Sequence, residues 1–443
     1  MLERGDMQGL LLSGYRSSPL SRYWLVRFEG SGAREWLGRL LSRITSGARD
    51  ERTRTARLNI AFTATGLAAL GLPEAALATF APEFRQGMAH AERSLVLGDR
   101  GESAPARWEF GHDVEHRVDA LLMQYAASEA ELDEGSAELE DELERFGLSA
   151  REEDAHLPSD GREPFGFAFS VSNPRLRAWP RLRQRNPYDP HVPAGEFVLG
   201  YLNASRRFPA SPTAPIRRGT RPLPRLTLGR RSMNWGENGT YLVLRKLAQD
   251  VEGFRRFTAR EGGAIFPGDP AAAERFASLL VGRTPDGTPL AGVAGDERAA
   301  ADPNRFGYRE DGRMATRCPL GAHVRRANPR DGLDGSARES LAEVRAHRLI
   351  RRGRVFGRAG DAERGLLFVA LCADIRGQFE FVQESWLNAP SAAGLTHERD
   401  PLVGSGPELP SAGGRETFSL QDQAVRRRVP LDRFVTVRGG AYL

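Results

Sequence analysis

Large side chains follow one another in a strand-like pattern over residues 23–28, which predicts a β-strand near the start of the chain. In residues 32–41, which follow, the apolar positions recur at helical spacing on one face: Trp36, Leu37, Leu40 and Leu41. A second strand is predicted over residues 58–63, and it leads into a helix over residues 66–71. The first part of the chain therefore contains two strand-helix units.

The second part repeats this organisation. Residues 241–247 predict a strand, and Val251, Phe254 and Phe257 then form one face of a helix. Another pair follows, with a strand over residues 366–372 and a helix over residues 379–387. Unpaired strands such as residues 118–125 lie between these units. The pattern favours an α+β fold of two ferredoxin-like domains with antiparallel sheets.

The segments between the halves are polar. Residues 129–154 form an acidic run that favours helix, whereas residues 205–226 are rich in proline and arginine and indicate a surface loop or flap. A chain of 443 residues is long enough for two complete cores. We place an N-terminal domain at residues 1–185 and a C-terminal domain at residues 186–443.

The charge pattern argues against nucleic-acid binding. The net charge is +5, but Lys246 is the only lysine and 58 acidic residues are interleaved with the arginines. No continuous basic stripe of the kind that follows a phosphate backbone results. No run approaches about 18 apolar residues, so no membrane span is expected. Because no secretory signal is visible and two cysteines cannot form a disulfide framework, we expect a cytoplasmic protein.

The segment with the most unusual composition is residues 318–330, CPLGAHVRRANPR, which places His323 in a non-periodic run of glycine, proline, asparagine and arginine. Such a run forms a shaped loop. Two interpretations of His323 are open on this loop alone: an iron ligand whose other ring nitrogen is held by a neighbour, or a solvated loop histidine.

This segment resembles the proximal-histidine segment of the dye-decolorizing (DyP-type) haem peroxidases. Further blocks resemble the family in its order: FGFAFSVSNP at residues 165–174, GEFVLGY at 195–201, NGTYLVLR at 238–245, and RGLLFV with QFEFVQESW at 364–369 and 378–386. The start of the chain, DMQG and RYWLVRF, is similar to longer members. The resemblance covers nearly the whole chain, and it implies a tandem ferredoxin-like fold that binds haem b.

The resemblance also implies roles for individual residues. His323 would be the fifth ligand of the haem iron, and Arg325 and Arg326 would contact the haem propionates. Arg351, in the segment LIRRGRVFG, would stabilise the negative charge that develops on peroxide, since a guanidinium stays charged at all working pH values. Leu366 and Phe368 would form the apolar wall of the pocket. Glu380 and Glu384 are the candidates for the group that holds the second nitrogen of His323.

One position departs from the family pattern. The aspartate of the family's GFRDG motif, which moves a proton during peroxide cleavage, falls on Phe169, and the following glycine falls on Ser170. A general acid/base contributes about 10²- to 10⁴-fold to a rate, and phenylalanine cannot supply it. Glu163 could fold back towards the iron as a substitute.

Three functions remain open on these residues. The first is a peroxidase that uses hydrogen peroxide and an organic electron donor, with altered or reduced activity. The second is a haem protein that binds a gas or haem itself, because Phe169 would make the pocket drier. The third is a haem-free structural partner, and a homo-oligomer is compatible with each. His112 and His116 are four residues apart and are expected to share the surface of a helix rather than bind metal.

Overall fold

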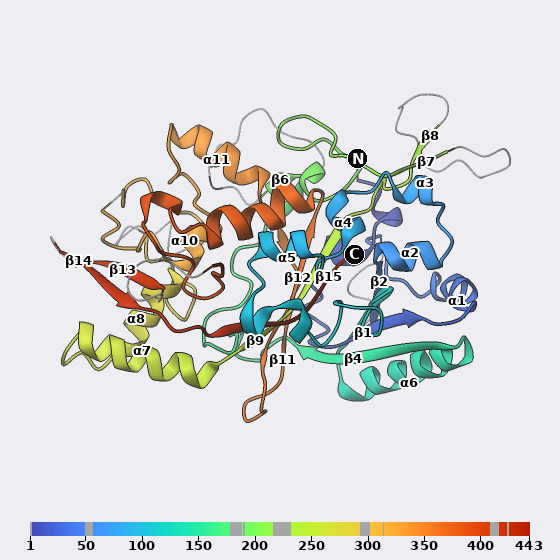
Figure 1. The fold of residues 1–443 in the computed structure, drawn as a ribbon, viewed down its shortest axis with the longest axis horizontal. Helices are drawn as coiled ribbons and strands as arrows, with labels where there is room; N and C mark the ends of the chain where they lie inside the picture. The colour runs from blue at the N-terminus through green and yellow to red at the C-terminus, as the bar shows by residue number, and fades with distance from the viewer. Residues whose placement is uncertain are drawn as a thin grey trace.

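The computed structural model describes residues 2–48, 56–177, 188, 191–215, 232–292, 302–312, 314–407, 416–422 and 425–443. At its centre is a nine-stranded antiparallel sheet that runs through both halves of the chain (Figure 1). Eight of the strands follow one another in the order β15 (Val435–Tyr442), β9 (Tyr241–Gln249), β12 (Gly365–Cys372), β11 (Arg354–Phe356), β4 (Leu148–His156), β1 (Leu20–Phe28), β3 (Ala120–Ala126) and β2 (Arg57–Phe62). The ninth, β10 (Ile350–Arg351), pairs with β12.

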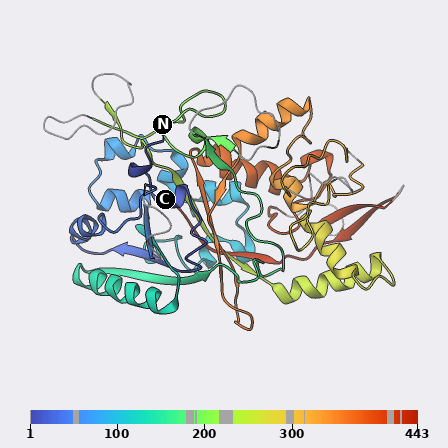
Figure 2. The ribbon, with the colours of Figure 1, turned by 180° about the vertical axis from the view of Figure 1, so that it is seen from behind.

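The two halves of the chain join edge to edge. Strand β4 of the first half pairs with β11 of the second half through His156 and Val355. Figures 1 and 2 show the halves on opposite sides of this junction. The predicted α+β architecture with antiparallel strands is confirmed, although the strands form one continuous sheet. The predicted domain boundary at residue 185 lies outside the described residues and stays a prediction.

Long helices cover the outer parts of the sheet. Helices α1 (Ala33–Leu40) and α6 (Glu129–Arg145) bury apolar side chains such as Trp36 and Leu139 against the first-half strands. Helices α7 (Val251–Ile265) and α8 (Ala272–Val281) pack together at the far end of the second half. The side chains of Ser128 and Asp250 accept backbone hydrogen bonds at the starts of α6 and α7, which is the usual way of satisfying a helix N-terminus.

Shorter elements connect these layers. The other α-helices in the described residues are α2 (Ala64–Ala69), α3 (Glu74–Leu77), α4 (Pro82–Gln86), α5 (Ala91–Leu97), α10 (His323–Ala327) and α11 (Ala337–Ala346). The remaining strands form pairs outside the main sheet: β5 (Arg175–Arg177) with β6 (His191–Pro193), β7 (Thr213–Pro215) with β8 (Ser232–Asn234), and β13 (Thr417–Asp422) with β14 (Val425–Pro430). Within the described ranges, no helix is long and apolar enough to cross a membrane.

Two predicted elements differ in the structure. The acidic run over residues 129–154 is helical only as far as Arg145, because the part from Leu148 onward pairs along its whole length with β1. Tertiary pairing here overrides an unfavourable composition. The helix predicted at residues 379–387 begins earlier and is wound as two π-helical stretches, η6 (Ile375–Glu380) and η7 (Val382–Asn388). π-Helical turns are frequently found at functional sites.

Candidate haem site

His323 is the first residue of the short helix α10, and its imidazole is held by a carboxylate that is distant in sequence. Its Nδ1 lies 2.9 Å from Oδ2 of Asp400, whose side chain is fully buried. The other oxygen of Asp400 accepts the backbone N–H groups of Leu402 and Val403. Nδ1 is therefore fixed, and Nε2 is the ring nitrogen left for a metal, which is the arrangement that orients a histidine ligand and raises its basicity.

The electrostatics of this pair follow from its burial and contact. Burial opposes protonation of His323, but the Asp400 carboxylate outweighs it, so the pKa of the imidazole is raised. Burial likewise disfavours the charged form of Asp400, but the His323 imidazole and the Val403 N–H hold the pKa of the carboxyl below its ordinary value. Asp400 is consequently an anion that polarises His323.

Sequence reasoning missed Asp400 and suggested Glu380 or Glu384 for this role. Glu380 is buried, but its carboxylate contacts the Arg93 guanidinium and the Tyr442 hydroxyl, each at 2.8 Å. Glu384 forms an ion pair with Arg376 at 2.9 Å. Neither faces His323. The sequence signal for Asp400 was weak, because a single aspartate before a proline is ordinary in loops.

Arg351 and the segment that resembles the GFRDG motif lie together, although about 180 residues separate them. The backbone N–H of Arg351 donates to the Asn173 side chain at 3.0 Å, and the Asn173 amide donates back to the Arg351 carbonyl at 3.0 Å. The Arg351 guanidinium also donates to the Ser172 carbonyl. This segment is thereby fastened to strand β10.

Arg351 is a cation without a counter-charge among the described side chains. It forms no ion pair there, and burial lowers its pKa. Arg351 and Glu163 both lie close enough to His323 to influence the pKa of the imidazole. The structure therefore brings the predicted ligand and the predicted peroxide-side arginine into one region.

Leu366 and Phe368 lie on the same face of the sheet as Arg351. Arg351 is paired directly opposite Ala370 of β12, so their side chains share a face. Side chains two and four residues before Ala370 return to that face, and these are Phe368 and Leu366. Both are half-buried, whereas their neighbours on the other face are buried in the core between the two halves. The predicted apolar wall stays a prediction, because Leu366 and Phe368 share the sheet face of Arg351 but do not line the cavity that Arg351 lines.

Phe169 is half-buried, and its N–H donates to the Gly161 carbonyl at 2.7 Å. Ser170, which follows, has a φ of 59°, a left-handed conformation that glycine adopts without strain. The chain thus keeps the backbone shape of a glycine position while carrying serine. The carboxylate of Glu163 accepts the N–H groups of Phe165 and Phe167, so this residue anchors the segment.

Arg325 and Arg326 were predicted to contact the haem propionates, but both form hydrogen bonds with other groups of the protein. The Arg325 guanidinium donates to Asp311 at 3.0 Å and to the Cys318 carbonyl at 2.7 Å. Arg326 donates to three backbone carbonyls, including that of Ala389 at 2.7 Å. Both guanidinium groups are thus held by partners within the protein, although Nε of Arg326 is buried without a partner among the described residues, so the propionate assignment gains no support.

Arg348 is an alternative candidate for contacting the haem propionates, and sequence reasoning did not single it out. Burial and the charges of Arg330, Arg351 and Arg345 lower its pKa to about 9. Among the described residues, no group accepts a hydrogen bond from its side chain. Arg330 is buried, Arg348 is half-buried and Arg351 is exposed, and the three lie close enough to repel one another, a repulsion that an anionic ligand would relieve.

A cavity of about 1550 Å³ adjoins this region. Phe169, Ser170, Asn173 and Arg351 line it, whereas His323 does not, so it opens onto the Arg351 side of the site. Its described lining carries one carboxylate, Asp302, against six arginines: Arg4, Arg16, Arg57, Arg175, Arg351 and Arg352. The cavity is strongly cationic.

Comparison with known proteins gives consistent results. The family model described as "Dyp-type peroxidase, C-terminal" matches residues 224–398. A multifunctional dye peroxidase of Amycolatopsis sp. is 28% identical over 424 residues, which cover 88% of this chain and 80% of the relative. A dye-decolorizing peroxidase of Mycetinis scorodonius is 26% identical, with 87% of this chain and 74% of the relative covered.

Solved structures extend the comparison to the fold. An ancestral D-type dye-decolorizing peroxidase aligns with a TM-score of 0.77 and 26% identity over 100% of this chain and 96% of that structure. A DyP-type peroxidase of Anabaena sp. aligns with a TM-score of 0.76 over 99% of this chain and 92% of that structure, at 22% identity. Taken with the joined ferredoxin-like halves and the His323–Asp400 pair, these matches show that the chain is similar to DyP-type peroxidases over most of its length and matches their C-terminal family model over residues 224–398.

Proposed function

We propose that this protein is a haem-dependent peroxidase that reduces hydrogen peroxide and oxidises an organic donor, with His323 as the ligand of the iron. The observation that carries the proposal is the contact between the half-buried His323 imidazole and the buried Asp400 carboxylate, in the same region as Arg351, which forms no ion pair with the described side chains. The residues fit haem b, which needs a neutral nitrogen for iron and cations for two carboxylates. Bound haem would supply the iron at which peroxide is reduced.

We assign the other roles in the reaction to side chains of this protein. Asp400 keeps His323 oriented and electron-rich. Arg351 stabilises the negative charge on the departing oxygen of peroxide, and its hydrogen bonds to the segment containing Ser172 and Asn173 hold it in position. Leu366 and Phe368 exclude water. Because Phe169 stands at the aspartate position and backbone N–H groups hold the Glu163 carboxylate, we infer that proton transfer relies on ordered water and that the rate is lower than with an acid/base residue.

The proposal also assigns the haem propionates to Arg348. Replacing Arg348 with glutamine should weaken haem binding about 10- to 100-fold, because a hydrogen bond to a charged group contributes about 1.5–3 kcal/mol. Replacement with lysine, which keeps the charge, should weaken it less. The measurement is a haem titration followed at the Soret band.

A chemical control separates this role from a structural one. Haem dimethyl ester has no propionate charge, so the wild type and Arg348→Gln should bind it with equal affinity. An equal loss of affinity for haem and for its ester in the variant would contradict the propionate assignment.

The positive charge of the cavity leads us to propose that the electron donor is an anionic aromatic compound. Six arginines against one carboxylate attract negative charge, and such attraction weakens as salt screens it. We expect the haem-supplemented protein to show a Soret band and to oxidise a sulfonated aromatic donor with a lower KM than its unsulfonated analogue. The KM difference should shrink as ionic strength rises.

The outcomes of this experiment are distinct. The absence of a Soret band would contradict the haem proposal. A Soret band without peroxide-dependent turnover would favour the haem protein of another purpose that Phe169 suggests. Turnover with the same KM for both donors at every ionic strength would leave the peroxidase in place and contradict the anionic donor.

A further inference from the structure

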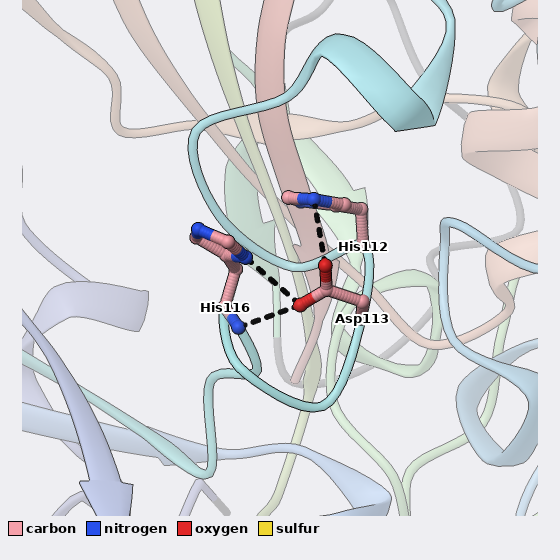
Figure 3. Close-up of side chains that lie close together, drawn as sticks. All are labelled: His112, Asp113 and His116. Carbon is pink, nitrogen blue, oxygen red and sulfur yellow. Dashed lines mark hydrogen bonds and ion pairs between the residues drawn. The ribbon is translucent and has the colours of Figure 1, made fainter.

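A second group of metal-binding side chains lies in the loop that precedes β3, apart from the haem site. His112, Asp113 and His116 meet there, and their ligand atoms all lie within 4.8 Å of one another. Figure 3 shows the Asp113 carboxylate beside both imidazoles, with a dashed line to each. Its Oδ2 lies 3.0 Å from Nε2 of His112, and its Oδ1 lies 2.9 Å from Nδ1 of His116. The expectation that these histidines share a helical surface is wrong, because the segment is a loop.

The backbone of this loop is held in a defined shape. The N–H of Gly111 donates to the His116 carbonyl at 2.6 Å and closes the loop. Gly111 has a φ of 85°, and a Cβ there would lie 2.1 Å from the Gly440 carbonyl oxygen, so the loop packs directly on β15. The Arg27 guanidinium donates to the Glu115 carbonyl from the other side. The two histidines are therefore held close together before any ligand binds.

The orientation of the imidazoles suits metal binding. Their rings are stacked with centroids 4.6 Å apart and planes 22° from parallel, and each directs a nitrogen towards the same carboxylate. Nδ1 of His112 is buried without a partner among the described residues, so Nε2 is the nitrogen through which this ring acts. Asp113 and His116 are each 46% exposed, which leaves the open side to water.

The donor set indicates the class of metal. Two imidazole nitrogens and one carboxylate oxygen are ligands that first-row transition-metal dications such as Zn²⁺ prefer over Ca²⁺ or Mg²⁺. Ligands of one Zn²⁺ lie at about 2.0–2.2 Å from it, and hence at most about 4.4 Å from one another. Small rotations of the exposed side chains bring all three atoms within that limit.

We propose that His112, Asp113 and His116 form a binding site for a transition-metal dication such as Zn²⁺, with water completing its coordination. The site takes all three protein ligands from one loop of the N-terminal half. None of them contacts His323, Asp400 or Arg351, so the proposal does not depend on the proposed peroxidase function.

A zinc titration of the haem-supplemented protein tests the proposal. We expect one Zn²⁺ per chain by isothermal titration calorimetry. His112→Ala, His116→Ala and Asp113→Asn should each weaken binding by at least about tenfold, since even losing a residue that only orients a ligand costs about 10- to 100-fold. His90→Ala is the matched control, because His90 is an exposed histidine outside the cluster, and it should bind zinc as the wild type does.

Two further measurements test whether zinc binds at this loop and not at another site. Zn²⁺ should raise the melting temperature of the wild type and of His90→Ala but not of His116→Ala, because a ligand of the folded state stabilises it. His323→Ala should retain the site, which separates it from zinc bound at the haem ligand. Failure of the wild type to bind Zn²⁺, or equal binding by the His112→Ala/His116→Ala double variant, would overturn the proposal.

Discussion

Replacing Asp400 with asparagine should raise the reduction potential of the bound haem and slow its reaction with hydrogen peroxide by about 10- to 100-fold. In the wild type the buried Asp400 carboxylate lies 2.9 Å from Nδ1 of His323 and makes the opposite ring nitrogen a stronger donor. Asparagine has nearly the same shape but no charge, so His323 keeps its place and loses its electron-rich character. Spectroelectrochemistry measures the potential, and stopped-flow absorption measures the rate.

A second buried aspartate provides the matched control. Asp331 accepts the Tyr188 hydroxyl at 2.7 Å and the Tyr308 backbone N–H at 2.6 Å, so Asp331→Asn also removes a buried charge. It should lower stability without moving the haem potential. If Asp400→Asn leaves the potential at the wild-type value, then Asp400 acts only as a structural group and the assigned role is wrong.

Replacing Phe169 with aspartate should accelerate the reaction with hydrogen peroxide by about 10²- to 10⁴-fold, the usual contribution of a general acid/base. Phe169 lines the same cavity as Arg351, and the residues that follow it are hydrogen-bonded to Arg351. With haem bound at His323 as proposed, a carboxylate at this position would stand on the Arg351 side of the site, where a proton has to move from one peroxide oxygen to the other. The measurement is the second-order rate constant of peroxide with the haem-loaded variant.

Two variants distinguish proton transfer from other causes. Phe169→Ala enlarges the pocket without adding a carboxylate. Its rate constant with hydrogen peroxide should therefore rise much less than that of Phe169→Asp. Glu163→Gln tests the rival carboxylate, whose two oxygens accept backbone N–H groups of Phe165 and Phe167. If Glu163→Gln in the wild-type background abolishes the reaction with peroxide, and Phe169→Asp reacts no faster than the wild type, then Glu163 is the proton carrier.

The sequence was sufficient for features that depend on local order. Apolar periodicity placed β1, β9 and β12 and the buried face of α7, because a strand or helix shows its spacing in consecutive residues. Short motifs singled out His323, Arg351 and Phe169 as candidates, since each lies within a contiguous segment, and the roles of these residues stay predictions. The strand pairing that puts Leu366 and Phe368 on the face of Arg351 also follows from strand alternation once β10 and β12 are paired.

Only the tertiary structure decided which groups meet across the chain. Asp400 lies 77 residues from His323, and no local pattern distinguishes it from Glu380, which the fold turns towards Arg93. Arg325 and Arg348 look alike in sequence, yet one is satisfied by Asp311 while the other lacks a described partner. The spacing of His112 and His116 suggested a helix, and packing on β15 made it a loop. The hydrogen bonds and the burial of a side chain depend on its neighbours in space. These neighbours come from distant parts of the chain, so the local sequence around the side chain does not reveal them.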